Sequence, residues 1–176
     1  ADRNGHKKRF LLICTLVGAL ATAALYLVGK GDWQAALLLF TLGSIGFFAG
    51  TSFYDSLIVH VAQPVEFDRV SALGYGLGYL GGGLLFAFNV MMALKPAWFG
   101  LADAAIATRL SFLMVGLWWI AFAMPLFIKV PEQAQPAAAG NDLAALVATF
   151  KQLLRLKPVW MFLLAYWLYI DGVDTI

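Results

Sequence analysis

Four long apolar stretches constrain this chain more than any other feature of its sequence. They cover residues 10–28, 33–61, 70–94 and 110–130. A helix needs about 20 apolar residues to cross the hydrocarbon core of a bilayer, and each stretch is long enough. The chain is 62% hydrophobic and 12% charged, whereas a soluble domain carries roughly 25% charged residues. The sequence therefore predicts an all-α membrane protein with four complete transmembrane helices.

The third stretch is unusually rich in glycine. Gly74, Gly78 and Gly82 recur at every fourth residue, so they share one face of the predicted helix. The missing side chains allow another helix to approach closely, and we expect this face to pack against other membrane helices. Residues 76–81 also match the Gly-x-Gly-x-x-Gly pattern of dinucleotide sites. That pattern needs a preceding strand and a soluble helix, so no nucleotide cofactor is predicted.

The composition changes after the fourth stretch. Residues 131–157 begin with a segment rich in Pro, Gln and Ala and are predicted to form a linker. Within it, residues 142–156 carry apolar side chains at the spacing of an amphipathic helix, which suits an anionic membrane surface. Residues 158–176 then start a fifth apolar span.

The basic residues are distributed unevenly between the two ends of these spans. One side would carry Arg3, Lys7, Lys8, Arg9, Arg69, Lys129, Lys151, Arg155 and Lys157, and the other Lys30, Lys95 and Arg109. The positive-inside rule places the richer side in the cytoplasm. Residues 1–9, 62–69 and 131–157 are therefore predicted to be cytoplasmic. The basic residues edge the membrane spans, so they indicate contact with lipid and not with nucleic acid.

The start of the chain resembles a known signature. Asp2-Arg3-Asn4-Gly5-His6-Lys7 is similar to the second half of the loop between helices 2 and 3 of the major facilitator superfamily, Gly-x-x-x-Asp-Arg-x-Gly-Arg-Arg/Lys. The leading glycine would lie before residue 1, and histidine stands at position 6 where the family usually has arginine. The linker resembles the superfamily's connection between its two six-helix halves.

Two further segments narrow the resemblance. FYDSLIVHVAQPVEFDRVSALGYGLGYLGGGLL and LLAYWLYIDGVDTI resemble the family called unknown major facilitators, which is related to fungal vacuolar amino-acid effluxers linked to autophagy. One departure is Asp55, where that family is expected to have asparagine. The resemblance implies a partial major-facilitator bundle. Residues 1–130 would form part of the N-terminal bundle as helices 3 to 6, and residues 158–176 would begin helix 7. The other helices would belong to the same longer chain.

The predicted fifth span carries carboxylates near the middle of the membrane. Asp171 lies about 18 Å along a helix that enters near Val159, at 1.5 Å per residue. A carboxylate there costs roughly 3 kcal/mol or more, so it usually faces a cavity and has a function. Asp171 and Asp174 are thus candidates for a substrate or proton pathway, with Tyr166 and Tyr169 as substrate contacts. The alternative is that both carboxylates are hydrated structural groups in the outer half.

The second and third spans hold the remaining polar candidates. Asp55 lies near the cytoplasmic end of its span and is predicted to pair with Arg3 when a cytoplasmic gate closes, although it could instead reach the headgroups. The resemblance implies that Asp2, Gly5 and Lys7 belong to the same signature loop. The third span adds Tyr75, Tyr79 and Asn89, which would either line the pathway or form hydrogen bonds to neighbouring helices.

Three classes of function are compatible with a helical membrane protein. A secondary active transporter would rock two bundles about a site at the midplane, and we expect it to carry a small polar organic solute. Amino-acid export, with protons as a possible coupling ion, rests on the resemblance. A non-transporting scaffold or accessory subunit is the alternative. An intramembrane protease would need a Gly-x-Gly before Asp171 and is rejected, so we predict no enzyme. No metal-ligand spacing occurs, and the composition favours a bacterial inner (plasma) membrane.

Overall fold

The structure is a computed structural model that describes residues 7–131, 150 and 155–175, with residues 171–175 described by their backbone alone. The chain divides into two compact units, Ala1–Pro136 and Ala137–Ile176. All described regular elements are helices, and four of them are long and apolar enough to cross a membrane. The predicted all-α membrane fold is therefore confirmed.

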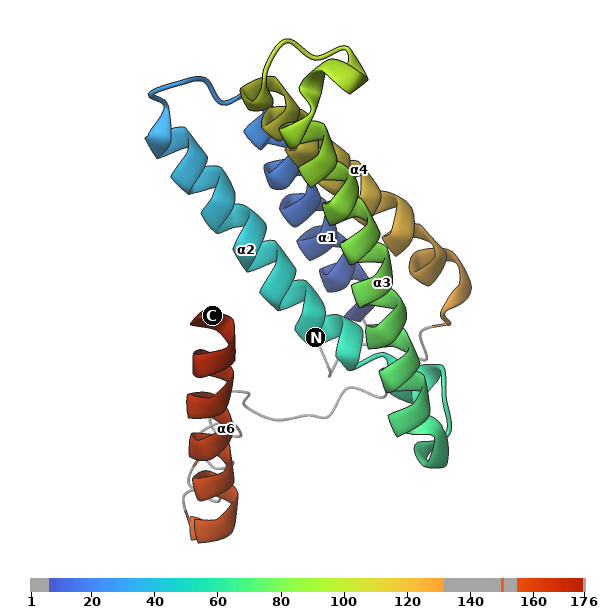
Figure 1. Cartoon of the computed structure of the whole chain (residues 1–176). Coiled ribbons are helices and arrows are strands. Elements are labelled where there is room, and N and C mark those ends of the chain that lie inside the picture. Colours follow the sequence, from blue (N-terminus) through green and yellow to red (C-terminus); the bar gives the residue numbers. More distant parts are fainter. Residues whose placement is uncertain (1–6, 132–149, 151–154, 176) are drawn as a thin grey trace. The chain divides into compact units, whose positions relative to one another are not determined.

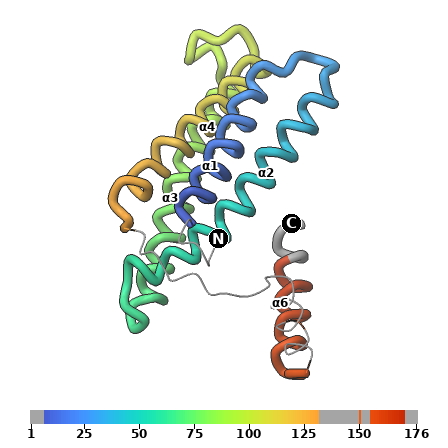
Figure 2. Tube along the Cα trace, turned by 180° about the vertical axis from the view of Figure 1, so that it is seen from behind, coloured from blue at the N-terminus to red at the C-terminus, as the bar shows by residue number. Residues whose placement is uncertain are grey.

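The first unit is a bundle of four helices that run alternately up and down (Figure 1). They are α1 (Lys7–Ala24), α2 (Trp33–Asp55), α3 (Phe67–Leu94) and α4 (Ala104–Lys129). Helix α1 lies between α2 and α4 and packs against both, and α3 packs against α4 (Figures 1 and 2). Helix α1 is therefore the centre of the bundle.

The helix ends differ from the predicted spans for local reasons. Helix α2 stops at Asp55 and continues as a separate 3-10 turn, Ile58–His60, where a single span to residue 61 was predicted. Helix α4 starts at Ala104, six residues before the predicted start at 110. The cause is Asp103, whose side chain accepts a hydrogen bond from the Ile106 amide at 2.8 Å and caps the helix. Hydropathy alone does not detect such a cap.

The closest helix contacts are made by glycines of α1, α2 and α4. A Cβ atom at Gly46 of α2 would lie 2.6 Å from the backbone of Gly18 on α1 and 2.7 Å from the carbonyl oxygen of Cys14. A Cβ atom at Gly116 of α4 would lie 2.7 Å from the carbonyl oxygen of Ala19. Because backbone atoms cannot move aside, only glycine permits these separations.

The glycines of α3 have a different environment. Around Gly78 and Gly82, nothing in the described part of the chain lies within 4 Å of an added Cβ atom. At Gly74 the nearest atom is the hydroxyl of Tyr54, at 3.4 Å. The close helix packing predicted for this face is therefore not made by the helices described, and it stays a prediction that concerns other helices.

Basic side chains connect the helices at both ends of the bundle. The Lys8 ammonium of α1 donates hydrogen bonds to the carbonyl oxygens of Phe127, at 2.9 Å, and Val130, at 2.6 Å. A cation at these C-terminal carbonyls satisfies unpaired acceptors and complements the helix dipole. At the other end, Arg109 Nε donates to the carbonyl oxygen of Tyr26 at 2.7 Å, with the guanidinium over the tyrosine ring.

The second unit contains helix α6 (Lys157–Thr175). Its start agrees to within one residue with the predicted start of the fifth span at 158. The backbone of Asp171 and Asp174 belongs to this helix, but their side chains lie outside the described residues. The predicted amphipathic helix 142–156 also lies almost entirely outside them.

We expect Gly46→Val to destabilise the bundle by roughly 1–3 kcal/mol, because the new side chain must push α1 and α2 apart. The matched control is Gly76→Val on α3, where no described residue lies within 4 Å of an added Cβ atom. Thermal unfolding in detergent micelles, followed by circular dichroism, measures both changes. Equal stability of the two variants would contradict the close α1–α2 contact.

We expect Lys8→Met to lower the free energy of unfolding by roughly 1–2 kcal/mol, since two carbonyl acceptors of α4 lose a charged donor. Lys30→Met is the control, because Lys30 is exposed in the loop between α1 and α2. The control should change stability by less than about 0.5 kcal/mol. The same unfolding measurement applies. An unchanged free energy of unfolding in Lys8→Met would show that water satisfies the two carbonyl groups as well as the ammonium does.

Candidate functional site

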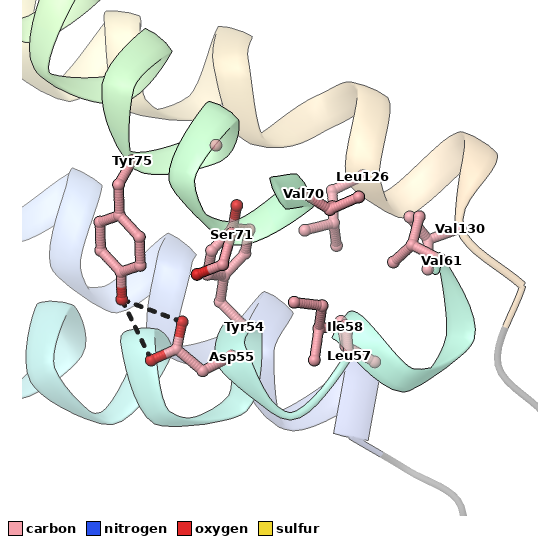
Figure 3. A pocket seen from close by; sticks show the side chains of 11 residues that line it. Tyr54, Asp55, Leu57, Ile58, Val61, Val70, Ser71, Tyr75, Leu126 and Val130 are labelled. Carbon is pink, nitrogen blue, oxygen red and sulfur yellow. Dashed lines mark hydrogen bonds between the residues drawn. The ribbon is translucent and has the colours of Figure 1, made fainter. Parts of the chain in front are cut away.

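A cavity of ≈ 450 Å³ lies at the end of the bundle where α2 leads into α3 and where α4 ends (Figure 3). Its walls come from the last turn of α2, the 3-10 turn that follows, the first turns of α3 and the last turn of α4. The lining residues are Tyr54, Asp55, Leu57, Ile58, Val61, Val70, Ser71, Gly74, Tyr75, Leu126 and Val130.

The break after α2 shapes this cavity. The Ser56 hydroxyl donates to the carbonyl oxygen of Phe53 at 2.7 Å, and the Leu57 amide donates to that of Tyr54 at 3.0 Å. These bonds satisfy acceptors at the end of α2 while the chain turns away from the helix axis. Leu57 becomes buried, with 2% of its surface exposed. The turn thereby leaves Asp55 as the last residue of α2, at the cavity wall.

A hydrogen bond joins the two helices across the cavity. The Tyr75 hydroxyl of α3 donates to the carboxylate of Asp55 on α2, at 3.2 Å from Oδ1 and 3.4 Å from Oδ2 (Figure 3). Both residues are exposed to the surroundings of the bundle, Tyr75 by 50%. A hydrogen bond to an ionised acceptor is stronger than a neutral one, although the distances are at the long end of the normal range.

The charge that lines the cavity is negative. Among the eleven lining residues, Asp55 alone carries a formal charge at neutral pH, and no Lys, Arg or His is present. Tyr54, Ser71 and Tyr75 add hydroxyl groups. Gly74 provides room for the Tyr54 hydroxyl, which would be 3.4 Å from an added Cβ atom. The remaining lining residues are aliphatic, so the cavity combines an anionic end with apolar walls.

The structure brings together three of the residues predicted from the sequence, Asp55, Tyr75 and Gly74, the last of which was predicted for helix packing. Tyr79 does not line the cavity and is 80% exposed. Asn89 lies further along α3 and is 9% exposed, and its Oδ1 has no hydrogen-bond partner among the described residues. Tyr166 is 55% exposed on α6, in the second unit.

Several predicted roles fall outside what the structure describes. Asp2, Arg3 and Gly5 precede the first described residue, so the gate between Arg3 and Asp55 stays a prediction. Lys7 begins α1, and Tyr169 is exposed on α6. The pathway roles of Asp171, Asp174, Tyr166, Tyr169, Tyr79 and Asn89 likewise stay predictions. In the described part of the chain, no group of three or more His, Cys, Asp or Glu residues could hold a metal ion.

Sequence reasoning missed part of the cavity wall. Ser71 precedes Gly74 and Tyr75 by three and four residues, so their shared helix face could have been found from spacing. Leu126 and Val130 could not, because their contribution depends on where the last turn of α4 lies relative to the first turns of α3 and the end of α2. Tyr54 was next to a predicted site residue, but its direction depends on the turn after Asp55.

Comparisons with known proteins find a matching family model and several relatives. The model of the family described as "Vacuole effluxer Atg22 like" matches residues 1–176. The uncharacterized MFS-type transporter YxiO of Bacillus subtilis is 33% identical, over all of this chain and 42% of its own length. Autophagy-related protein 22 of Yarrowia lipolytica is 27% identical, over 61% of this chain and 22% of its own length. The chain thus spans less than half the length of these relatives. No solved structure matches.

We expect Tyr75→Phe to lower the free energy of unfolding by roughly 0.5–1.5 kcal/mol, because it removes one hydrogen bond of a partly exposed pair. Tyr79→Phe, one turn away, should have no effect. A double-mutant cycle with Asp55→Asn isolates the pairwise term. Additive effects of the two substitutions would show that the Tyr75–Asp55 hydrogen bond contributes nothing to stability.

Proposed function

This chain belongs to the family described as vacuole effluxer Atg22 like, and from that membership we propose that it forms part of a secondary active transporter. The observation that carries the proposal is the family match over residues 1–176, together with the 33% identity to an MFS-type transporter along the whole chain. We place the protein in a bacterial inner (plasma) membrane, with residues 1–9, 62–69 and 131–157 in the cytoplasm.

The open face of α3 supports an alternating-access mechanism. Carriers of this kind move two helical bundles against each other around a site at the midplane. The glycines at 78 and 82 have no neighbour within 4 Å of an added Cβ atom in the described part of the chain. A smooth face of this kind can accept a moving helix more easily than one with large side chains. We propose that further helices of a longer chain cover it, since the relatives exceed this chain in length.

We propose that the transported solute is a small polar organic molecule, with amino-acid export as the specific case. The family's description as an effluxer supports export as the direction of transport. The assignment of amino acids as the solute rests on the sequence resemblance. Its pathway would use Asp171, Asp174, Tyr166 and Tyr169, together with Tyr75, Tyr79 and Asn89 of α3. A carboxylate at membrane depth suits either a substrate ammonium group or a proton.

Transport by the reconstituted protein tests this proposal. The protein that contains this chain is placed in proteoliposomes and supplied with a panel of labelled amino acids, with and without a pH gradient. We expect saturable uptake of at least one amino acid above that of protein-free liposomes. Absence of uptake and of exchange for the whole panel would reject amino-acid transport and favour the scaffold or accessory-subunit alternative.

Within that assay, we expect Asp171→Asn to reduce uptake by about tenfold or more, because a charged partner of substrate or proton is lost. Asp68→Asn is the matched control, since Asp68 is exposed in the first turn of α3 and does not line the cavity. Unchanged uptake and unchanged pH dependence in Asp171→Asn would remove this residue from the pathway.

A further inference from the structure

We propose that the cavity beside Asp55 binds a primary ammonium group that carries a short apolar substituent, presented as a free solute. The inference builds on the proposed function, because it names a class of solute that the carrier would take up at this end of the bundle. Binding itself can be tested without transport. It follows from the charge, the hydroxyl groups and the apolar walls of one cavity.

The charge of the cavity selects a cation. An ionised carboxylate has about four acceptor positions, and Tyr75 supplies one hydroxyl donor to Asp55. With respect to the described residues, the carboxylate therefore keeps free acceptor capacity, and no basic side chain among them lines the cavity. Asp55 is also the last residue of α2, where the negative end of the helix dipole disfavours a second negative charge. A bound cation would use the free acceptor positions of the carboxylate and would offset the unfavourable interaction of its charge with the helix dipole.

The hydroxyl and aromatic groups favour an ammonium ion over a metal ion. Ca²⁺ takes about six to eight oxygen ligands and Mg²⁺ about six, whereas the described residues that line this cavity include one carboxylate and three hydroxyl-bearing side chains. A primary ammonium needs three acceptors. The rings of Tyr54 on α2 and Tyr75 on α3 also line the cavity, and the face of a tyrosine ring can interact with a cation.

The apolar walls determine the rest of the ligand. Leu57, Ile58, Val61, Val70, Leu126 and Val130 surround the space away from Asp55 (Figure 3). The volume of ≈ 450 Å³ falls within the roughly 300–1,000 Å³ of small-molecule sites. A ligand with a cationic end and a short hydrocarbon chain would therefore bury its chain while its ammonium reaches the carboxylate. A small inorganic cation would leave these walls without contact.

Calorimetric titration with n-butylammonium chloride tests the site directly. The protein that contains this chain is used in nanodiscs of phosphatidylcholine, with 1-butanol as the neutral analogue of similar shape. We expect n-butylammonium to bind and 1-butanol not to bind. Asp55→Asn should weaken n-butylammonium by about tenfold or more, because a charged hydrogen-bond partner is lost. Tyr75→Phe should weaken it by a smaller factor, and the control Asp68→Asn should not change it.

Four results would overturn the proposal. The first is that n-butylammonium does not bind, and the second is that 1-butanol binds with the same affinity as n-butylammonium. The third is that Asp55→Asn binds n-butylammonium as tightly as the wild type does. If Asp55→Asn does not fold, the fourth is that Tyr75→Phe binds n-butylammonium as tightly as the wild type does.

Two further measurements distinguish a free solute from other cations that could bind to Asp55. Arg3→Gln should strengthen n-butylammonium binding by less than about tenfold, because the predicted gate pairs Arg3 with Asp55 only when it is closed. Binding that is tighter by about tenfold or more would show that Arg3 occupies the site and would reject the free solute. Adding phosphatidylethanolamine to the nanodiscs should also leave the affinity unchanged. Loss of binding there would assign the cavity to a lipid headgroup and reject the free solute.

The outcomes distinguish this inference from the proposed function. If n-butylammonium binds through Asp55 but no solute is transported, the transporter proposal fails and the binding site stands. If transport is robust and Asp55→Asn neither binds less nor transports less, the binding site fails and the transporter proposal stands.

Discussion

The close approach of α1 to α2 and α4 is the constraint on which the rest of the bundle depends. Gly46 lies against the backbone of Gly18, and Gly116 lies against that of Ala19. Water does not drive helices together inside a bilayer, so contact between backbones and small side chains must supply the association. Because α1 is held from two sides, it fixes the separation of its neighbours. The positions of the helix ends, where the polar groups lie, follow from that separation.

The end of the bundle with the candidate site is organised by hydrogen bonds from side chains to helix termini and to a carboxylate. Lys8 satisfies carbonyl oxygens at the end of α4, and Tyr75 holds Asp55 at the end of α2. The carbonyl oxygen of Val130 accepts a hydrogen bond from Lys8, and Val130 also lines the cavity beside Asp55. The start of α1, the end of α4 and the cavity are therefore mechanically connected.

Helix α3 has two different environments along its length. Its first turns contact the end of α2 and line the cavity, and its later turns contact α4, where Met92 and Asn89 are buried. Between them, Gly78 and Gly82 face open space in the described part of the chain. Large apolar side chains such as Phe86 and Leu84 are exposed on the same helix, which is normal for a surface that meets lipid or other membrane helices. Gly81, between Gly78 and Gly82, faces Trp118 of α4 instead, at 4.0 Å from an added Cβ atom. One face of α3 therefore packs on α4 while the other stays open for a partner.

The sequence by itself determined the number, the approximate position and the membrane character of the four helices, because hydrophobic length depends only on the order of residues along the chain. Two local features could also have been read from it, the Asp103 cap and the shared face of Ser71 and Tyr75. The tertiary structure decided which glycines make close contacts. Spacing favoured those of α3, but Gly46 and Gly116 are the ones at which an added Cβ atom would lie within 3 Å of a backbone, and Gly18 faces the ring of Trp119. It also decided that Asp55 meets Tyr75, twenty residues away. Such contacts depend on the angle and separation of packed helices and on where each helix ends, and a one-dimensional pattern contains neither quantity.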